Sequence, residues 1–151
     1  IAQLINVLQA VILTDGPRML LTPTYHVFHM YKYHQDAALL ESYLDGAKKI
    51  GEEEDYMVPN LQESVSLDKD GIVTVTLNNL SVTDSEEMEI VFTERHPDHV
   101  TAAIVTNQMD AYNTFDNPDT VKEAVFEDFT VTDRGVTFTM PACSVVQFRI
   151  K

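Results

Sequence analysis

The sequence contains no tryptophan, a single cysteine and only five glycines. One cysteine, Cys143, cannot form an internal disulfide, so nothing in the 151 residues requires an oxidising compartment. Long apolar runs are also missing. Asp15 interrupts the best candidate, residues 1–14, which falls short of the roughly 18–20 apolar residues that a membrane-spanning helix needs. We therefore expect neither a disulfide scaffold nor a membrane span.

Basic residues are scarce, with 10 Lys plus Arg against 24 Asp plus Glu and a formal net charge of −14. A strongly acidic chain repels phosphate groups, so we expect no nucleic-acid partner and no binding to anionic membranes. The hydrophobic fraction of 44% is typical of a globular protein. The chain opens at Ile1 without a basic stretch or a small-residue cleavage site, which predicts an internal position in a longer protein.

Residues 46–55 separate two parts of different composition. The first part, residues 1–45, is apolar and aromatic, whereas the second part, residues 56–151, reads as short strands and turns. The segment between them holds two glycines and the acidic run Glu52–Asp55, which suit an exposed connection. We predict a domain boundary there, with residues 46–55 as an exposed acidic linker.

The second part alternates between apolar and polar residues with the period of two that β-strands show. This alternation occurs in residues 73–77, 88–92, 136–140 and 146–150. Asp68–Gly71 and Asp133–Gly135 lie next to such stretches and have the composition of hairpin turns, because glycine accepts a positive φ at little cost. The pattern predicts an all-β antiparallel sandwich or jelly roll.

The first part predicts a helix rich in aromatic residues. Thr22 can cap its N-terminus, Pro23 fits the first helical position, and the helix is expected from Thr24 to about His34. Apolar residues cover most of its circumference, so we expect it to be buried on several sides. Residues 7–13 form another apolar stretch, of strand or helix type. About 40 residues cannot enclose this surface alone, so these elements need a covering surface outside the 151 residues.

The histidines and the cysteine are weak candidates for chemistry. His26 and His29 lie three residues apart and could share a metal, but no Cys or acid completes a tetrahedral set nearby. His96 and His99 lie in a turn and have no further ligands. We interpret all of them as packed or hydrogen-bonded side chains and expect no metal. Cys143 is interpreted as a small core residue of the last strand rather than a nucleophile.

No catalytic motif is found among the acids. They occur in surface-like runs, which favours a solvated acidic face: residues 52–55, 86–87 and 127–128. The Asn-Glu dipeptide, a glycine-rich phosphate loop and a Gly-x-Ser-x-Gly elbow are all absent. The sequon Asn79-Leu80-Ser81 is common by chance, and Asp68–Gly71 lacks the remaining ligands of a calcium loop. We therefore expect no catalytic residue and no cofactor.

Three blocks of sequence nevertheless form a recognisable set. They are residues 1–10 (IAQLINVLQA) with 21–32 (LTPTYHVFHMYK), residues 112–121 (YNTFDNPDTV), and residues 140–146 (MPACSVV). In this order they resemble the C-terminal part of the family 51 α-L-arabinofuranosidases, in which a second proline often replaces Ala142. The resemblance covers essentially the whole chain.

The resemblance implies a (β/α)8 barrel followed by a β-sandwich of jelly-roll type. Residues 1–45 would be the last barrel segment and its closing helix, and residues 56–151 would be the C-terminal sandwich, so the chain itself would be mainly β. In this family the sandwich also takes up strands from the extreme N-terminus of the enzyme. Both parts of the chain would then lack neighbours that a longer protein supplies.

The resemblance also implies retaining hydrolysis of terminal non-reducing α-L-arabinofuranosyl groups from arabinan, arabinoxylan and their oligosaccharides. Both catalytic glutamates would lie upstream of Ile1, so no catalytic residue is expected here. One substrate-binding residue carries over, Gln3, whose amide can exchange hydrogen bonds with sugar hydroxyls. The alternative for Gln3 is an interior amide that neighbouring backbone groups satisfy.

Family members are commonly homo-oligomers, often hexamers, and the bacterial ones are commonly cytoplasmic, so the resemblance implies both properties. The alternative function is a non-catalytic carbohydrate-binding or structural β-sandwich module. Tyr56, Tyr112 and Phe115 would then be candidates for stacking on sugar rings. The lack of tryptophan argues against this alternative, because sugar-binding modules usually present exposed aromatic platforms.

Overall fold

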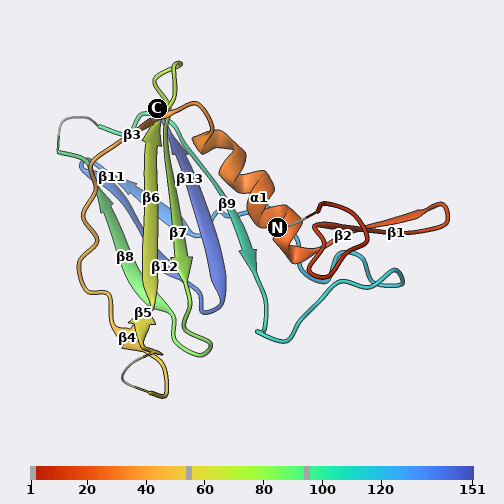
Figure 1. Cartoon of the computed structure of the whole chain (residues 1–151). Helices are drawn as coiled ribbons and strands as arrows, with labels where there is room; N and C mark the ends of the chain where they lie inside the picture. The colour runs from red at the N-terminus through yellow and green to blue at the C-terminus, as the bar shows by residue number, and fades with distance from the viewer. Residues whose placement is uncertain (1–2, 54–55, 94–95) are drawn as a thin grey trace.

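The computed structural model describes residues 3–53, 56–93 and 96–151, which fold mainly into β-strands (Figure 1). The elements in chain order are β1 (Ile12–Asp15), β2 (Arg18–Leu21), α1 (Pro23–Tyr31), the 3₁₀ helix η1 (Lys32–His34), β3 (Ala38–Leu39), β4 (Lys49–Ile50), β5 (Val58–Pro59), β6 (Leu61–Leu67), β7 (Val73–Asn79), β8 (Glu86–Val91), β9 (Val100–Thr106), β10 (Ala124–Val125), β11 (Phe129–Thr132), β12 (Gly135–Met140) and β13 (Ser144–Ile150).

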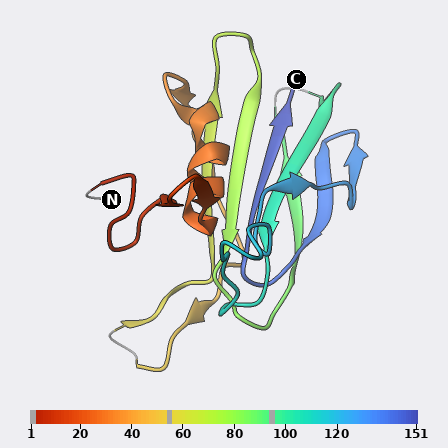
Figure 2. The same ribbon diagram turned by 90° about the vertical axis from the view of Figure 1, so that its right-hand side faces the viewer.

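Two antiparallel sheets face each other and form a sandwich (Figures 1 and 2). The larger sheet has the order β10-β9-β13-β7-β6-β3, and the smaller one has the order β11-β12-β8. Strand β13 is central, because it pairs with both β7 and β9 along its whole length. The antiparallel sandwich predicted from the alternation is therefore confirmed, and the four predicted strands correspond to β7, β8, β12 and β13 within one or two residues at their ends.

The core lies between the two sheets. On β13, the side chains of Val146, Phe148 and Ile150 point inward and are fully buried, as the period-two pattern predicts. Phe138 of β12 packs on Phe148 with a ring-centroid distance of 4.7 Å, and Phe126 meets both rings edge-on. These aromatic contacts join the sheets across the sandwich.

The turn between β6 and β7 is built by Asp68, as its sequence predicts. The carboxylate oxygen Oδ1 of Asp68 accepts hydrogen bonds from the backbone N–H groups of Asp70 and Ile72, both at 2.9 Å. The bond from Ile72 is the largest cause that lowers the pKa of Asp68 below its usual value. Gly71 has a φ of +79°, a conformation that glycine adopts without strain.

Helix α1 packs on the outer face of the larger sheet, next to β9 (Figures 1 and 2). Met30 is fully buried there against Val105 and Val121. This is the face of the sheet that the sandwich core does not use, because Val105 and Val145 alternate with the inward-pointing residues of β9 and β13. The helix gives way to η1 at Lys32, slightly before the predicted end.

The predicted capping role of Thr22 is wrong. Thr22 occupies the N-cap position, but its side chain makes no capping hydrogen bond. Its hydroxyl Oγ1 instead donates to the carbonyl oxygens of Ala10 and Val11, at 3.1 and 3.0 Å. The chain at Ala10 and Val11 passes directly beside the start of the helix. Its carbonyl groups therefore bind the hydroxyl, which does not bond the N–H groups of the first helical turn.

Cys143 is not the core residue of a strand that we expected. It lies in the turn between β12 and β13, is only partly buried, and has a φ of +48°. Its backbone N–H donates to the carbonyl oxygen of Ser81 at 2.8 Å, which holds the turn in this conformation. The strand itself begins one residue later, at Ser144.

The described residues contain no (β/α)8 barrel, since every pairing between their named strands is antiparallel. The described part of residues 1–45 contacts the sandwich through α1, and β3 pairs with β6. Strand β4, which lies within residues 46–55, pairs with β5 just after them to form a hairpin at one end of the sandwich. Glu54 and Asp55 of the predicted linker lie outside the described residues.

Candidate functional site

Gln3 is the first described residue, and it lies in an exposed segment, residues 3–9 (Figure 1). Its neighbours Leu4, Ile5 and Leu8 are large apolar side chains that are also exposed, Leu8 to 95%. Ile1 and Ala2, the first two residues of the same block, lie outside the described part. Gln3 therefore borders a surface that is far more apolar than the acidic composition of the chain would suggest.

The segment after Gln3 folds back on itself and on β1. The carbonyl oxygen of Leu4 accepts hydrogen bonds from the N–H groups of Val11 and Ile12, at 3.1 and 3.0 Å. The side chain of Asn6 bonds both the backbone N–H and the hydroxyl of Thr14, at 2.7 and 2.8 Å. Asn6 has a φ of +52°, a region that Asn tolerates better than most residues. Local hydrogen bonds thus define the path of the chain beyond Gln3.

An open, mostly apolar hollow of about 420 Å³ lies between this segment and helix α1. Its lining comes from the chain before β1, from α1 and from the first residue of η1: Leu4, Val11, Tyr25, Phe28, His29 and Lys32. Phe28 is more than half exposed, so the helix presents apolar surface on the side away from the sheet. Among the described residues of α1 only Met30 is buried, so this chain does not provide the burial on several sides that we expected.

The histidines of α1 do not come together as metal ligands. Lys32 Nζ lies 2.6 Å from Nε2 of His29, and because an ammonium group can only donate, Nε2 accepts and Nδ1 carries the proton. That proton is donated to Glu123 Oε2 at 2.6 Å. His26 lies one turn earlier, where burial lowers its pKa. Across residues 3–53, 56–93 and 96–151, no group of three or more His, Cys, Asp or Glu could hold a metal ion.

His34 belongs to a polar network on the outer face of the larger sheet. Its Nδ1 and Nε2 lie 2.7 and 2.8 Å from the hydroxyl oxygens of Ser66 and Thr76. Thr76 also accepts a hydrogen bond from Gln147 Nε2 at 2.9 Å. Burial lowers the pKa of His34, so its neutral form is favoured. The sequence signal is the polar residues that alternate with apolar ones along β7 and β13, but alternation alone does not show that η1 and α1 cover them.

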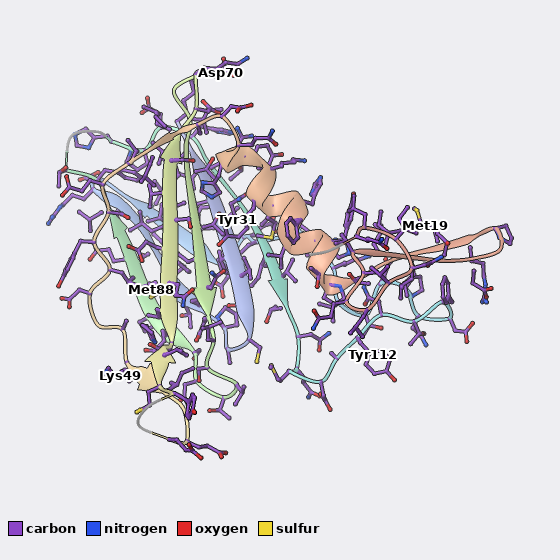
Figure 3. The ribbon with its side chains drawn as sticks, viewed as in Figure 1. Met19, Tyr31, Lys49, Asp70, Met88 and Tyr112 are labelled. Atoms are coloured by element: carbon purple, nitrogen blue, oxygen red, sulfur yellow. The ribbon has the colours of Figure 1, made fainter. Side chains whose placement is uncertain are left out.

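The loop of residues 107–123 lies beside the β1–β2 hairpin (Figures 1 and 3). Asn113 in this loop is buried and donates to the carbonyl oxygen of Leu21 at 2.9 Å. Arg18 of β2 lies 3.8 Å from Asp116 and stacks over the ring of Phe115, with 4.8 Å from its guanidinium carbon to the ring centroid. Arg18 also pairs with Asp15. The loop therefore connects the sandwich to the segment that carries Gln3.

The sequence of the chain matches a known protein family. Residues 1–144 match the family described as the α-L-arabinofuranosidase C-terminal domain. The chain belongs to this family.

Individual proteins similar to this arabinofuranosidase C-terminal domain are arabinofuranosidases as well. It is 34% identical to the intracellular exo-α-L-arabinofuranosidase of Bacteroides ovatus, over 100% of this chain and 29% of that protein. The GH51 arabinofuranosidase from Xanthomonas axonopodis pv. citri superposes with a TM-score of 0.91 at 36% identity, over 99% of this chain and 30% of that one. The α-L-arabinofuranosidase from Thermotoga maritima, in an arabinose complex, has a TM-score of 0.81 at 21% identity, over 98% of this chain and 32% of that one, which shows the fold alone.

The arabinofuranosidase C-terminal domain spans less than a third of the length of these relatives. Its antiparallel, mainly β architecture is the one that these enzymes carry at their C-terminal end. In the part of the chain that the structure describes, the longest helix is α1, and no helix is long and apolar enough to cross a membrane.

The stacking candidates do not form one platform in this domain. Tyr112 lies on the loop beside the β1–β2 hairpin, whereas Tyr56 lies at the hairpin of β4 and β5, on another part of the molecule (Figures 1 and 3). Both rings are largely exposed, but the ring of Phe115 is covered on one side by Arg18. Three rings so placed cannot follow one sugar chain as a continuous surface.

The remaining candidates have structural roles. Asn79 of the sequon is 2% exposed, and its amide nitrogen donates to the carbonyl oxygens of Asp84 and Pro141, so the side chain is closed to modification. His96 Nδ1 lies 2.5 Å from the carbonyl oxygen of Asp133. Glu86 accepts hydrogen bonds from Lys48 and from the amide of Asn60. Each of these groups links segments that are far apart in the sequence.

Proposed function

We propose that this chain is the C-terminal part of a retaining α-L-arabinofuranosidase that releases terminal non-reducing α-L-arabinofuranosyl groups from arabinan, arabinoxylan and their oligosaccharides. The observation that carries the proposal is the 36% identity and TM-score of 0.91 to a GH51 arabinofuranosidase over 99% of the chain. The name of the Bacteroides ovatus relative, an exo-α-L-arabinofuranosidase, supports the same reaction.

Retaining hydrolysis needs two carboxyl groups about 5–5.5 Å apart, one as nucleophile and one as acid and base. We place both on the part of the protein that precedes residue 1, in the earlier strands of a (β/α)8 barrel. Residues 1–45 would complete that barrel, and residues 56–151 would form a sandwich of jelly-roll type behind it. Leu4, Ile5 and Phe28 are exposed apolar side chains in this chain and support this placement. Such apolar surface normally packs against another part of the protein or against a partner.

Gln3 would be the contribution of this chain to the substrate site. Its amide can donate to one sugar hydroxyl and accept from another, which fixes the orientation of the sugar relative to the carboxyl groups. A position near the end of a barrel strand is where substrate contacts are found in this type of fold. The exposure of Gln3 in the isolated chain is compatible with this role.

The same proposal includes a cytoplasmic location and a homo-oligomeric assembly, a hexamer by resemblance to the family. The location is supported by the intracellular relative and by a single cysteine that requires no oxidising compartment. Light scattering coupled to gel filtration of the full-length protein measures the assembly directly.

The test of the Gln3 assignment is the variant Gln3→Ala in the full-length protein, assayed with p-nitrophenyl α-L-arabinofuranoside. We expect kcat/KM to fall by about 10-fold to 100-fold, because a substrate displaced by about 1 Å can react about 100-fold more slowly. Gln62→Ala is the matched control, because Gln62 is an exposed glutamine of β6 within the sandwich. A Gln3 variant with the kcat/KM of the control would refute the assignment.

A further inference from the structure

Asn113 is a buried side chain whose hydrogen bonds all go to the main chain. It is 8% exposed, and its Nδ2 donates to the carbonyl oxygens of Leu21 and Val121, at 2.9 and 2.8 Å. Its Oδ1 accepts from the N–H of Val121 at 2.7 Å. The bonds to Val121 close the loop on itself, whereas the bond to Leu21 ties the loop to the end of β2, 92 residues earlier in the chain.

The loop is anchored on the sandwich at its other end. Val121 is buried against Met30 of helix α1 and Val105 of β9, on the outer face of the larger sheet. Asn113 is therefore hydrogen-bonded to a residue that is packed on the sheet. The position of its amide nitrogen is defined by packing as well as by hydrogen bonds.

From β2, a path of alternating peptide bonds and hydrogen bonds leads to Leu4, the residue next to Gln3. Thr22 follows Leu21, and its backbone N–H and hydroxyl both donate to the carbonyl oxygen of Val11, at 3.1 and 3.0 Å. The N–H of Val11 in turn donates to the carbonyl oxygen of Leu4 at 3.1 Å. Ala10, Val11 and Leu20 are buried, so the middle of this path is packed, whereas Leu4 at its end is 60% exposed.

We propose that Asn113 is a positioning residue that fixes the location of Gln3 from the sandwich, through Leu21, Thr22, Val11 and Leu4. The inference rests on the proposed function, because it assigns a purpose to the position of Gln3. The sandwich would then influence the substrate site indirectly. A loop between its strands would fix the position of the amide that contacts the sugar. A displacement of about 1 Å in such a contact can reduce the rate about 100-fold.

The test uses the full-length protein with the variant Asn113→Asp, which keeps an acceptor for the N–H of Val121 but removes both donors. Thr22→Val is a second variant of the same path, since it removes the hydroxyl with little change in shape. Asn79→Asp is the matched control. Asn79 is also a buried asparagine with bonds to main-chain groups, those of Asp84, Pro141 and Ser81, but it lies outside the path.

Each variant is made with Gln3 present and in the Gln3→Ala background, and kcat/KM is measured well below the unfolding temperature. With Gln3 present, we expect Asn113→Asp and Thr22→Val to lose about 10-fold in kcat/KM, and Asn79→Asp to lose less than about twofold. In the Gln3→Ala background, the losses from Asn113→Asp and Thr22→Val should shrink to less than about twofold, because the group that they position is gone.

Two results would overturn the inference while leaving the proposed function intact: a kcat/KM equal to wild type in both path variants although Gln3→Ala is impaired, or equal losses with and without Gln3. The second result would mean that Asn113 acts on stability or on another part of the site. If Asn113→Asp fails to fold, Thr22→Val decides between the same outcomes. Full activity of Gln3→Ala would instead refute the Gln3 assignment, and the inference would fall with it.

Discussion

The side-chain amide of Gln147 donates one hydrogen bond to the carbonyl oxygen of Met30, at 2.8 Å, and another to the hydroxyl of Thr76, at 2.9 Å. Gln147 lies on the central strand β13, and Met30 lies in the last turn of α1, where carbonyl groups lack partners within the helix. Both residues are buried. This pair therefore joins the helix to the outer face of the larger sheet by a bond shielded from water.

Gln147→Ala should loosen the helix without unfolding the sandwich. The substitution leaves the carbonyl of Met30 and one site on Thr76 without a partner, which costs about 1–3 kcal/mol for a buried group. We expect the N–H groups at the end of α1 to exchange with deuterium about 10-fold to 100-fold faster in the full-length protein. The exposed Gln62→Ala serves as the control. Unchanged exchange in α1 would show that Gln147 does not hold the helix.

His34 should make this attachment sensitive to pH. Burial lowers its pKa below the usual value of 6.5, so in the range between the two pKa values the unfolded chain binds more protons than the folded one. The contribution of His34 is therefore present above about pH 6.5 and is lost as the pH falls through the folded pKa. The groups that face its ring are the hydroxyls of Ser66 and Thr76 and the ring of Tyr31.

The measurement is the unfolding temperature of the full-length protein between about pH 7.5 and about pH 5.5. Wild type should lose more stability over this range than His34→Gln, which cannot titrate. Both proteins contain the same carboxyl groups, so the difference between them isolates His34. His99→Gln, a change at an exposed histidine, should behave like wild type. A His34→Gln protein with the pH dependence of wild type would contradict the expectation.

The period-two alternation was sufficient to predict the sandwich, because inward residues such as Val146 and Phe148 are the ones that the core requires. The same reasoning could not assign Thr76 and Gln147. Polar residues on the other face of a strand indicate solvent, and only the position of α1, set by contacts distant in sequence, shows that they are buried. The prediction that Thr22 caps the helix was wrong for a related reason. The local sequence does not show that the loop of Ala10 and Val11 lies close enough to accept the hydrogen bond from its hydroxyl.

Gly135 occupies a position that no side chain can share. A Cβ built there would lie 1.7 Å from the carbonyl oxygen of Ile90 on the paired strand β8. Gly135→Ala must push β8 and β12 apart, and we expect a loss of about 1–3 kcal/mol, the usual cost of overpacking. Gly71→Ala is the matched control in another hairpin turn: its Cβ would have open space, and only its φ of +79° opposes the change, at about 1 kcal/mol.

Calorimetric unfolding of the full-length protein compares the two glycine variants. Gly135→Ala should lower the unfolding temperature of the transition that includes the sandwich by more than Gly71→Ala does. A larger loss in Gly71→Ala than in Gly135→Ala would contradict this expectation. It would mean that β8 and β12 can move apart at Gly135 at little cost, although they are paired there.

Of the candidate site, sequence reasoning supplied Gln3 and the block of residues 112–121, both through resemblance to the family. It did not connect them. Asn113 and Leu21 are 92 residues apart, and nothing in their local sequence predicts the hydrogen bond between them. The interpretation of the histidines as packed or hydrogen-bonded side chains holds for His29 of α1, which pairs with Glu123, and for His34 of η1, which lies beside two hydroxyls. Nε2 of His26 is buried and has no hydrogen-bond partner among the described residues.

The central claim is that this chain belongs to an α-L-arabinofuranosidase whose catalytic carboxyl groups lie outside residues 1–151. Its most direct test is the hydrolysis of p-nitrophenyl α-L-arabinofuranoside by the full-length protein and by residues 1–151 alone, under identical conditions. The full-length protein should release p-nitrophenol, and the 151-residue chain should not exceed the buffer background, because a retaining mechanism needs both carboxyl groups. Turnover by residues 1–151, abolished by replacing one of their own acids, or an inactive full-length protein, would contradict the account.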